Sequence, residues 1–505
     1  MNIKTTIPIA VMAMLMSPLT SRAQTGGSLT PPAGAPGKTM KSLDQMEPRT
    51  PLIEGAPGVG IDPSGRISIS APGSYYLTGN LTIPGGTGIF IGGSDITLDL
   101  RGFTISSTSS AANGYAIQIQ GSNITIFNGK IVSGSSYSGG TFSGGGYIYG
   151  IFSPSSASQQ LHIHDVSVEG CSSYGIYLSD ADSSQVHHCS VTSCGGVGIN
   201  AGLITQCIVD GCGSTGILGR SVSNCRSSVI SGHGISATTV HSSSGISNSS
   251  GDGIRATRVN ASYGYAGAGA TSGIDASRSV TDSTGETRGS GHGITSAVVT
   301  GSHGHAAGSL SFAGILATAS VSDSYGLTEG IGYGIQSTTV QNSYGASETS
   351  NASHGITAYS IMNSYGSSEG GHGIYSVSSV AYSYGTSSGG CGIRTPQVLS
   401  TGGHVSYCTG ISTGSSSDDH GIDGYFNVTG SYGNSASGDG IQGANVSHSY
   451  GYSTGDDGIY ATRVVSYSTG NRASGTAGAH GIEAPLVIGC QATGTIDATT
   501  EHLGP

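Results

Sequence analysis

Three acidic residues and one histidine near the end of the chain have types and spacing suited to sugar chemistry. Asp439 is followed by the pair Asp456 and Asp457 and then by His480, at intervals of about one sequence repeat. Hydrolysis of a glycosidic bond needs one carboxyl group as an acid and a second carboxylate that activates water or attacks the sugar. We therefore consider Asp439, Asp456, Asp457 and His480 as candidate catalytic residues.

The same region offers a candidate metal site. His420, Asp439, Asp457 and His480 each lie two residues before a recurrent isoleucine, so stacking of the repeats would bring them close together. Alternatively, polar side chains at this corner bind the backbone of the turn. We favour this structural interpretation and expect no cofactor, because two residues that are poor ligands share the column: Ala313 and Tyr333.

A column of tyrosines forms a second candidate surface, within recurrent Ser-Tyr-Gly triplets. Its members are Tyr325, Tyr344, Tyr365 and Tyr384, followed by Tyr432 and Tyr450. Stacked rings could present an aromatic surface to a glycan. The alternative, which we favour, is that the rings seal the corner between successive repeats.

Most of the nine cysteines share this periodicity. Cys171, Cys189, Cys207 and Cys225 follow one another at a constant step, each shortly after a β-branched residue, and are predicted to face the core in one column. Cys194 and Cys212 form a second pair with the same step. The odd total and the apolar behaviour of buried thiols favour free cysteines over disulfides. A zinc site is the least favoured option, because the chain contains no Cys-x-x-Cys pair.

The elements that must position these residues are set by a recurrent Gly-Ile pair. Most steps between the isoleucines are about 20 residues long, which is typical of a repeat architecture, and a β-branched residue follows each isoleucine by five or six positions. The isoleucines are Ile176, Ile199, Ile217, Ile235, Ile254, Ile274, Ile294, Ile315, Ile335, Ile356, Ile374, Ile393, Ile422, Ile441, Ile459 and Ile482. Short β-branched runs between turn residues, without a 3.6-residue apolar stripe, predict strands.

Stacking of these units gives an all-β fold, a single-stranded right-handed parallel β-helix with about 18–21 residues per coil and an N-terminal cap. Equivalent residues of neighbouring coils then lie roughly 4.8 Å apart, and the isoleucines form a continuous buried rib. The step from Ile393 to Ile422 is longer than the others and predicts an insertion, which should protrude as a loop between Pro396 and His404.

We expect five segments along the chain. Residues 1–23 form a secretory signal peptide, with Lys4 before a short apolar run and Ala23 at the cleavage site. Residues 24–60 form a Pro/Gly-rich leader, 61–160 the cap and long coils, 161–490 the regular repeats and 491–505 a tail. The apolar run is too short to span a membrane, so the mature chain is expected to be secreted or held at the cell surface or envelope.

Composition limits the partners. The formal net charge is −11, and charged residues make up only 9% of the chain. Its four lysines, of which Lys130 is the last, all precede the regular repeats. Nucleic acid is therefore not an expected partner, since phosphate binding needs clustered basic residues.

The repeats, together with three N-terminal motifs, resemble the right-handed parallel β-helices of the pectin-lyase-like superfamily, in particular secreted bacterial members without an assigned function. The motifs are Gly73-Ser74-Tyr75-Tyr76-Leu77, Asp95-Ile96-Thr97-Leu98-Asp99-Leu100-Arg101-Gly102-Phe103 and Asn123-Ile124-Thr125-Ile126-Phe127-Asn128-Gly129. The resemblance covers residues 61–490. It implies the fold but no single activity, because the superfamily includes lyases, hydrolases and adhesins.

Polygalacturonase-type members carry acidic residues, then Asp-Asp, Gly-His-Gly and Arg-Ile-Lys on successive coils. Asp439, Asp456-Asp457 and His480 resemble the first three parts, but no Lys or Arg follows Arg472 to bind a uronate. Pectate-lyase chemistry needs Ca²⁺ carboxylates and a basic residue, and the repeats contain no lysine. The resemblance therefore does not supply a complete catalytic set.

These observations favour an exported, non-catalytic β-helix with a structural, adhesive or glycan-contacting role at the cell surface. Its expected partner is a polysaccharide or a cell-envelope glycan, and its expected state is a monomer or a homotrimer. The alternative is a polysaccharide-active hydrolase or lyase on the same fold. We further expect water to screen Asp456 and Asp457 and to leave both ionised.

Overall fold

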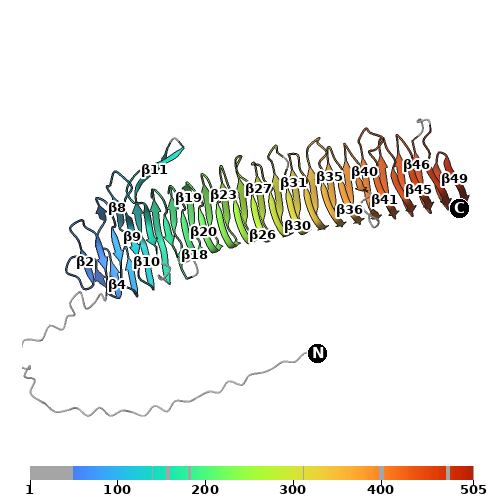
Figure 1. Cartoon of the computed structure of the whole chain (residues 1–505). Helices are drawn as coiled ribbons and strands as arrows, with labels where there is room; N and C mark the ends of the chain where they lie inside the picture. The colour runs from blue at the N-terminus through green and yellow to red at the C-terminus, as the bar shows by residue number, and fades with distance from the viewer. Residues whose placement is uncertain are drawn as a thin grey trace, which may run out of the picture. The chain divides into compact units, whose positions relative to one another are not determined.

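The computed structural model describes residues 49–138, 140–154, 160–179, 183–310, 312–396, 403–473 and 478–503. The predicted signal peptide and residues 24–48 of the expected leader lie outside these ranges. Residues from Arg49 onward form one compact unit. It is a parallel β-solenoid of about 20 turns without a helix among the described residues, which confirms the predicted fold class (Figure 1).

The first coils are irregular. Thr50–Pro51 (β1) pairs in parallel with β4, and Val59–Ile61 (β2) pairs antiparallel with β3. The strands that follow are β3 Ile67–Ile69, β4 Gly73–Tyr76, β5 Leu81–Ile83, β6 Ile89–Ile91, β7 Ile96–Asp99, β8 Thr104–Ser107, β9 Tyr115–Ile119, β10 Ile124–Val132, β13 Tyr149–Ser153, β14 Leu161–Glu169, β15 Ile176–Leu178, β16 Gln185–His187 and β17 Ser190–Thr192. A separate antiparallel hairpin, β11 (Gly134–Ser138) with β12 (Thr141–Gly145), projects from the stack (Figure 1).

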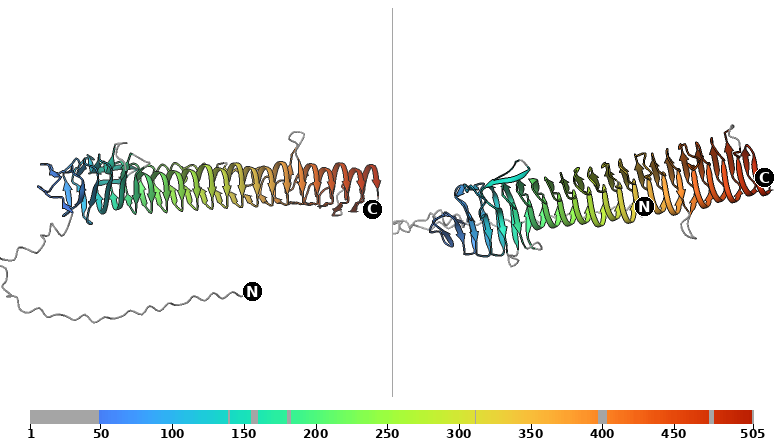
Figure 2. Two further views of the ribbon diagram at one scale, coloured as in Figure 1. Left: turned by 90° about the horizontal axis from the view of Figure 1, so that it is seen from below. Right: turned by 45° about the horizontal axis from the view of Figure 1, so that its top comes forward.

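From Ile199 onward each coil has one long and one short strand. The long strands are β18 Ile199–Thr205, β20 Ile217–Ser223, β22 Ile235–His241, β24 Ile254–Asn260, β26 Ile274–Thr281, β28 Ile294–Thr300, β30 Ile315–Ser322, β32 Ile335–Gln341, β34 Ile356–Met362, β36 Ile374–Ala381, β38 Ile393–Thr395 with β39 His404–Ser406, β41 Ile422–Thr429, β43 Ile441–Ser447, β45 Ile459–Ser466, β47 Ile482–Ile488 and β49 Ile496–Leu503. Each long strand pairs in parallel with that of the next coil (Figure 2).

The short strands form a second parallel ladder. They are β19 Ile208–Cys212, β21 Arg226–Val229, β23 Ser244–Ser247, β25 Tyr263–Ala266, β27 Thr284–Thr287, β29 His303–Ala306, β31 Tyr325–Thr328, β33 Tyr344–Ser347, β35 Tyr365–Ser368, β37 Tyr384–Ser387, β40 Thr409–Ser412, β42 Tyr432–Ser435, β44 Tyr450–Ser453, β46 Thr469–Arg472 and β48 Gln491–Thr493. Residues 491–503, expected as a tail, thus contribute β48 and β49 to the stack.

The recurrent isoleucines and valines form the predicted buried ribs. Ile335 pairs with Ile356, and Val340 pairs with Ile361 in the same register; all four side chains are at most 2% exposed. The glycine before each isoleucine lies in a crowded corner. A Cβ atom on Gly334 would lie 2.3 Å from the backbone nitrogen of Ala346, so a larger residue cannot occupy this position without moving the backbone.

Eight of the nine cysteines lie in two columns, and one predicted assignment is wrong. The ninth, Cys391, lies in the polar column before the isoleucines. Cys189, Cys207 and Cys225 stack in register, since the N–H of each of the first two binds the thiol of the next. Cys171 belongs instead with Cys194, because Val168 pairs with Val191 and the N–H of Gly195 binds the carbonyl of Cys171. The coil from Val168 to Val191 is longer than the step from Cys171 to Cys189, so that step does not correspond to one coil. All nine cysteines are free and buried, as predicted.

The insertion between Ile393 and Ile422 does not separate the coils on either side of it. Ile393 pairs directly with Ile422, as predicted. After the insertion, β39 pairs with the second half of β41 and so completes the long strand of this coil. The predicted protruding loop falls mainly on residues 397–402, outside the described ranges. In the described part of the chain we find no helix with the length and hydropathy of a membrane span.

Candidate functional site

The polar column before the isoleucines has a structural role. The histidine, aspartate and serine side chains that precede His480 in this column accept a hydrogen bond from the backbone N–H of the next coil, as in His354 Nδ1 with His372 N (2.9 Å) and His372 Nδ1 with Cys391 N (2.9 Å). Because Nδ1 accepts, these rings are neutral. Burial also lowers the pKa of His354 to about 4 and that of His372 to about 3. This supports binding of the turn backbone as the reason for the column.

At the C-terminal end the column brings the candidate catalytic residues together. Asp439 and Asp457 occupy successive coils, and the N–H of Asp457 binds Oδ1 of Asp439 at 3.2 Å. One oxygen from each of Asp439, Asp456 and Asp457 lies within 4.8 Å of the others. Three of the candidate catalytic side chains therefore lie close together.

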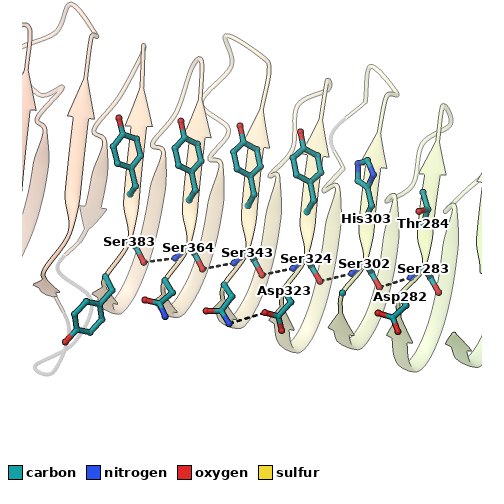
Figure 3. Close-up of a pocket in the computed structure, with 18 of the residues that line it drawn as sticks. Asp282, Ser283, Thr284, Ser302, His303, Asp323, Ser324, Ser343, Ser364 and Ser383 are labelled. Carbon is teal, nitrogen blue, oxygen red and sulfur yellow. Dashed lines mark hydrogen bonds between the residues drawn. The ribbon is translucent and has the colours of Figure 1, made fainter. Parts of the chain in front are cut away.

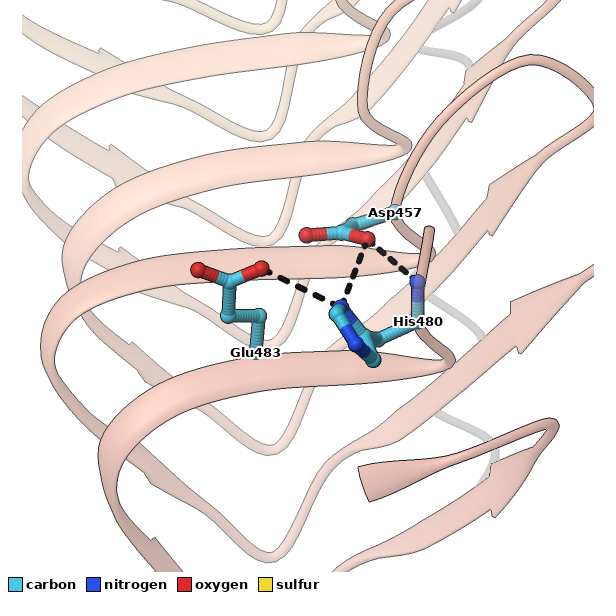
Figure 4. Close-up of side chains that lie close together, drawn as sticks. All are labelled: Asp457, His480 and Glu483. Carbon is cyan, nitrogen blue, oxygen red and sulfur yellow. Dashed lines mark hydrogen bonds and ion pairs between the residues drawn. The ribbon is translucent and has the colours of Figure 1, made fainter. Parts of the chain in front are cut away.

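The side chain of His480 contacts carboxylates and not a backbone N–H, because the regular coils end here. Its Nδ1 lies 3.2 Å from Oε2 of Glu483 and 3.6 Å from Oδ1 of Asp457 (Figure 4). Its backbone N–H binds the same Asp457 oxygen. Glu483, which we did not predict, thus completes a second group with Asp457 and His480; its position three residues after His480 was the available signal.

Burial sets the charge state of this cluster. Removal from water, followed by the charges of Asp456 and Asp457, raises the pKa of Asp439 to about 8. Burial likewise raises the pKa of Asp457 to about 6. The expectation that water would screen Asp457 is wrong, because its side chain is only 6% exposed. Asp439 is therefore largely protonated at neutral pH.

The four candidate metal ligands His420, Asp439, Asp457 and His480 do not form one group. Nδ1 of His420 accepts the N–H of Asp439 at 2.9 Å, which directs its lone pair to the backbone. The groups that could hold an ion are instead Asp439 with Asp456 and Asp457, and Asp457 with His480 and Glu483. The ligand atoms of both groups are mainly carboxylate oxygens, which suit a hard cation such as Mg²⁺, Ca²⁺ or Mn²⁺. The nearby guanidinium of Arg472 binds the carbonyl of Ala479.

The tyrosine column forms a regular stack, as predicted. Tyr325, Tyr344, Tyr365 and Tyr384 lie with ring centroids 4.8–5.0 Å apart and ring planes within 6° of parallel. Neighbouring rings therefore cover each other's faces within the stack. The stack presents ring edges and phenolic hydroxyls outward, and ring faces only at its ends.

A shallow groove of about 1000 Å³ runs beside this stack. Its floor is a row of serines. The backbone N–H of each serine donates to the hydroxyl of the serine on the next coil, for example Ser324 N to Ser343 Oγ at 3.2 Å, and the last, Ser383, donates to the thiol of Cys408 (Figure 3). Each hydroxyl in turn donates to a carbonyl two residues earlier, as Ser343 Oγ does to Gln341 at 2.7 Å. The floor is thus neutral and internally hydrogen-bonded.

The opposite wall consists of residues with a left-handed backbone, one from each coil. Asp323, Asn342 and Asn363 are followed in this column by Tyr382 and Tyr407, all with φ between 48° and 53°. The last two rings stack at 5.3 Å and are 59% and 57% exposed. We did not predict this wall, although a polar or aromatic residue lies two positions after many of the recurrent valines.

The groove has a distinct chemistry. Asp282 and Asp323 are the acidic residues among those that line it, and Lys and Arg do not occur among them. The lining therefore offers phenol, amide, imidazole and carboxylate groups, but no Lys or Arg for an acidic polymer.

Comparisons of the chain with models of protein families, with curated proteins and with solved structures gave no match. The fold is therefore established by the coils themselves, and the resemblance to the pectin-lyase-like superfamily remains an expectation.

Proposed function

We propose that this chain is an exported, non-catalytic solenoid that contacts a glycan along the groove beside the tyrosine stack. The observation that carries the proposal is the groove itself, whose two walls display phenolic hydroxyls, side-chain amides and exposed rings along several coils. Sugars are bound by such mixtures of aromatic and polar groups. A neutral glycan fits best, because the lining contains two carboxylates and no Lys or Arg.

The rings of Tyr382 and Tyr407 are the strongest contact candidates, being more than half exposed. Their exposure distinguishes them from the Tyr325–Tyr384 stack, whose rings are half-buried. Aromatic rings supply contact area at a small cost in side-chain entropy. We therefore assign the glycan contact to this wall and a mainly structural role to the stack.

The test is binding of the mature protein to a panel of polysaccharides by affinity electrophoresis. Tyr382→Asn and Tyr407→Asn remove the rings, and asparagine tolerates their left-handed backbone. Tyr467→Asn is a matched control, because Tyr467 also has a left-handed backbone and is 62% exposed, but does not line the groove. We expect the double variant to lose retardation and the control to keep it. Equal retardation of both proteins would refute the proposal.

A second candidate function, glycosidic-bond hydrolysis, rests on the C-terminal carboxyl cluster. Asp439 and Asp457 have pKa values near 8 and 6, the kind of separation that lets one group act as acid and the other as base. Reducing-end and unsaturated-product assays on the same panel test it. Turnover that is lost in Asp457→Asn would put this function first.

A further inference from the structure

Four histidines gather on the outer surface near the start of the regular coils. His162 and His164 alternate with core residues in β14, so both side chains point outward. His187 of β16 pairs with His164 in the parallel ladder, and Gln185 pairs with His162. Three imidazoles therefore share one face of two neighbouring strands, with His188 at the adjoining corner.

Hydrogen bonds determine which nitrogen of two of these rings carries the proton. Nδ1 of His164 lies 2.7 Å from Oδ2 of Asp165, and a carboxylate can only accept, so Nε2 keeps a free lone pair. Nε2 of His162 donates to Oε1 of Gln185 at 2.5 Å, which leaves its Nδ1 without a proton. A carboxylate or amide partner on the second ring nitrogen is a usual companion of metal-binding histidine, because it fixes the tautomer and the ring orientation.

The imidazoles of this group lie in an accessible position. A groove of about 270 Å³ is lined by His162, His164 and His187 together with Asp165 and Gln185. Nδ1 of His188 lies 3.5 Å from Asp165, whose carboxylate is thus shared between two rings.

We propose that His162, His164 and His187 bind one divalent transition-metal ion of the Zn²⁺ class, with Asp165 as a positioning residue for His164. Imidazole nitrogens suit Zn²⁺, Cu²⁺ and Ni²⁺. Two imidazoles on one tetrahedral ion at the usual Zn–N distance have ring centres roughly 5 Å apart. The centroids of His162 and His164 are 6.3 Å apart, so the two rings must rotate towards each other to bind one ion.

This site is independent of the groove proposed for glycan and of the C-terminal carboxyl cluster. It consists of imidazoles on an exposed strand face, whereas the C-terminal cluster is mainly carboxylate and lies many coils away in the sequence. The sequence signal is His-x-His-Asp at 162–165 followed by His-His at 187–188, one coil later.

The experiment is calorimetric titration of the full chain with Zn²⁺, supported by the visible absorption of bound Co²⁺. We expect one high-affinity ion per chain at pH 7.5. His162→Ala, His164→Ala and His187→Ala should each weaken binding at least tenfold, and Asp165→Asn about 10- to 100-fold. Asparagine suits the left-handed backbone of Asp165 (φ 54°), so this change leaves the fold in place.

Two controls make the result decisive. His448→Asn removes an imidazole far from this face and should leave binding unchanged. The double variant Asp457→Asn/Glu483→Gln disables the C-terminal groups and should also leave the high-affinity ion in place. Equal affinity in the wild type and the His162→Ala/His164→Ala/His187→Ala variant, or loss of the ion only in the C-terminal variant, would overturn the proposal.

Discussion

Nδ1 of His420 accepts a hydrogen bond from the backbone N–H of Asp439, one coil further along the solenoid, at 2.9 Å. The same type of bond recurs along the polar column, so a side chain that looks catalytic in the sequence satisfies a buried backbone donor. His420 itself is only 7% exposed, which makes water a poor substitute for its nitrogen. This relationship leads to the first of four predictions.

Loss of that acceptor should destabilise the C-terminal coils. His420→Ala leaves the Asp439 N–H buried and unpaired, at a cost of about 1–3 kcal/mol. His420→Asn keeps an oxygen acceptor and should recover part of the loss. Hydrogen exchange of the Asp439 amide, measured by mass spectrometry, reports both effects. Equal protection in the alanine and asparagine variants would contradict the explanation.

The free energy of unfolding of the coils around Asp439 should fall as the pH rises. The pKa of Asp439 is raised from 3.8 to about 8, so the folded state binds more protons than the unfolded state between these values. The stabilising contribution is therefore complete below about pH 4 and is lost as pH rises towards 8, by about 1.4 kcal/mol per pH unit at most.

The variant Asp439→Asn should remove this dependence. We expect it to protect residues 441–466 from exchange more than the wild type at pH 8, and to have little effect at pH 5. Asp323→Asn, an exposed change in the groove wall, serves as the control. A gain in protection that is the same at both pH values would argue against titration of Asp439.

The serine row should accept cysteine but not alanine. Ser343→Ala leaves the N–H of Ser324 without its acceptor, for a loss of about 1–3 kcal/mol. Ser343→Cys should lose less, because the chain already places Cys207 in this column, where its sulfur accepts the N–H of Cys189 at 3.5 Å. Exchange of the Ser324 amide distinguishes the variants, and equal exchange in both would show that the thiol does not replace the hydroxyl.

The glycine of the Ser-Tyr-Gly triplet should not tolerate a methyl group. A Cβ atom on Gly345 would lie 2.4 Å from the carbonyl oxygen of Gly355 and 2.6 Å from Cγ1 of Ile356, both in the packed stack. Gly345→Ala should therefore cause local loss of order and a clear fall in the midpoint of thermal unfolding. Gly79→Ala, where nothing lies within 4 Å of the added atom, should unfold like the wild type.

The repeat region illustrates how much of this fold can be predicted. Ile335, Ile356 and Ile374 pair in one register because identical residues recur at coil length, so a local pattern specifies a long-range contact. Cys171 shows the limit of this logic. The step from Cys171 to Cys189 equals the later cysteine steps but crosses a longer, irregular coil, and only the pairing of Val168 with Val191 revealed the correct column.

The sequence by itself determined the parallel solenoid, its buried ribs and its tyrosine stack, because each depends on residue type at a repeated position. The tertiary structure alone decided the burial of Asp457, the approach of Glu483 to His480 and the shared face of His164 and His187. Burial and mutual approach depend on what neighbouring coils place around a side chain. Coils of unequal length shift those neighbours in a way that no single repeat encodes.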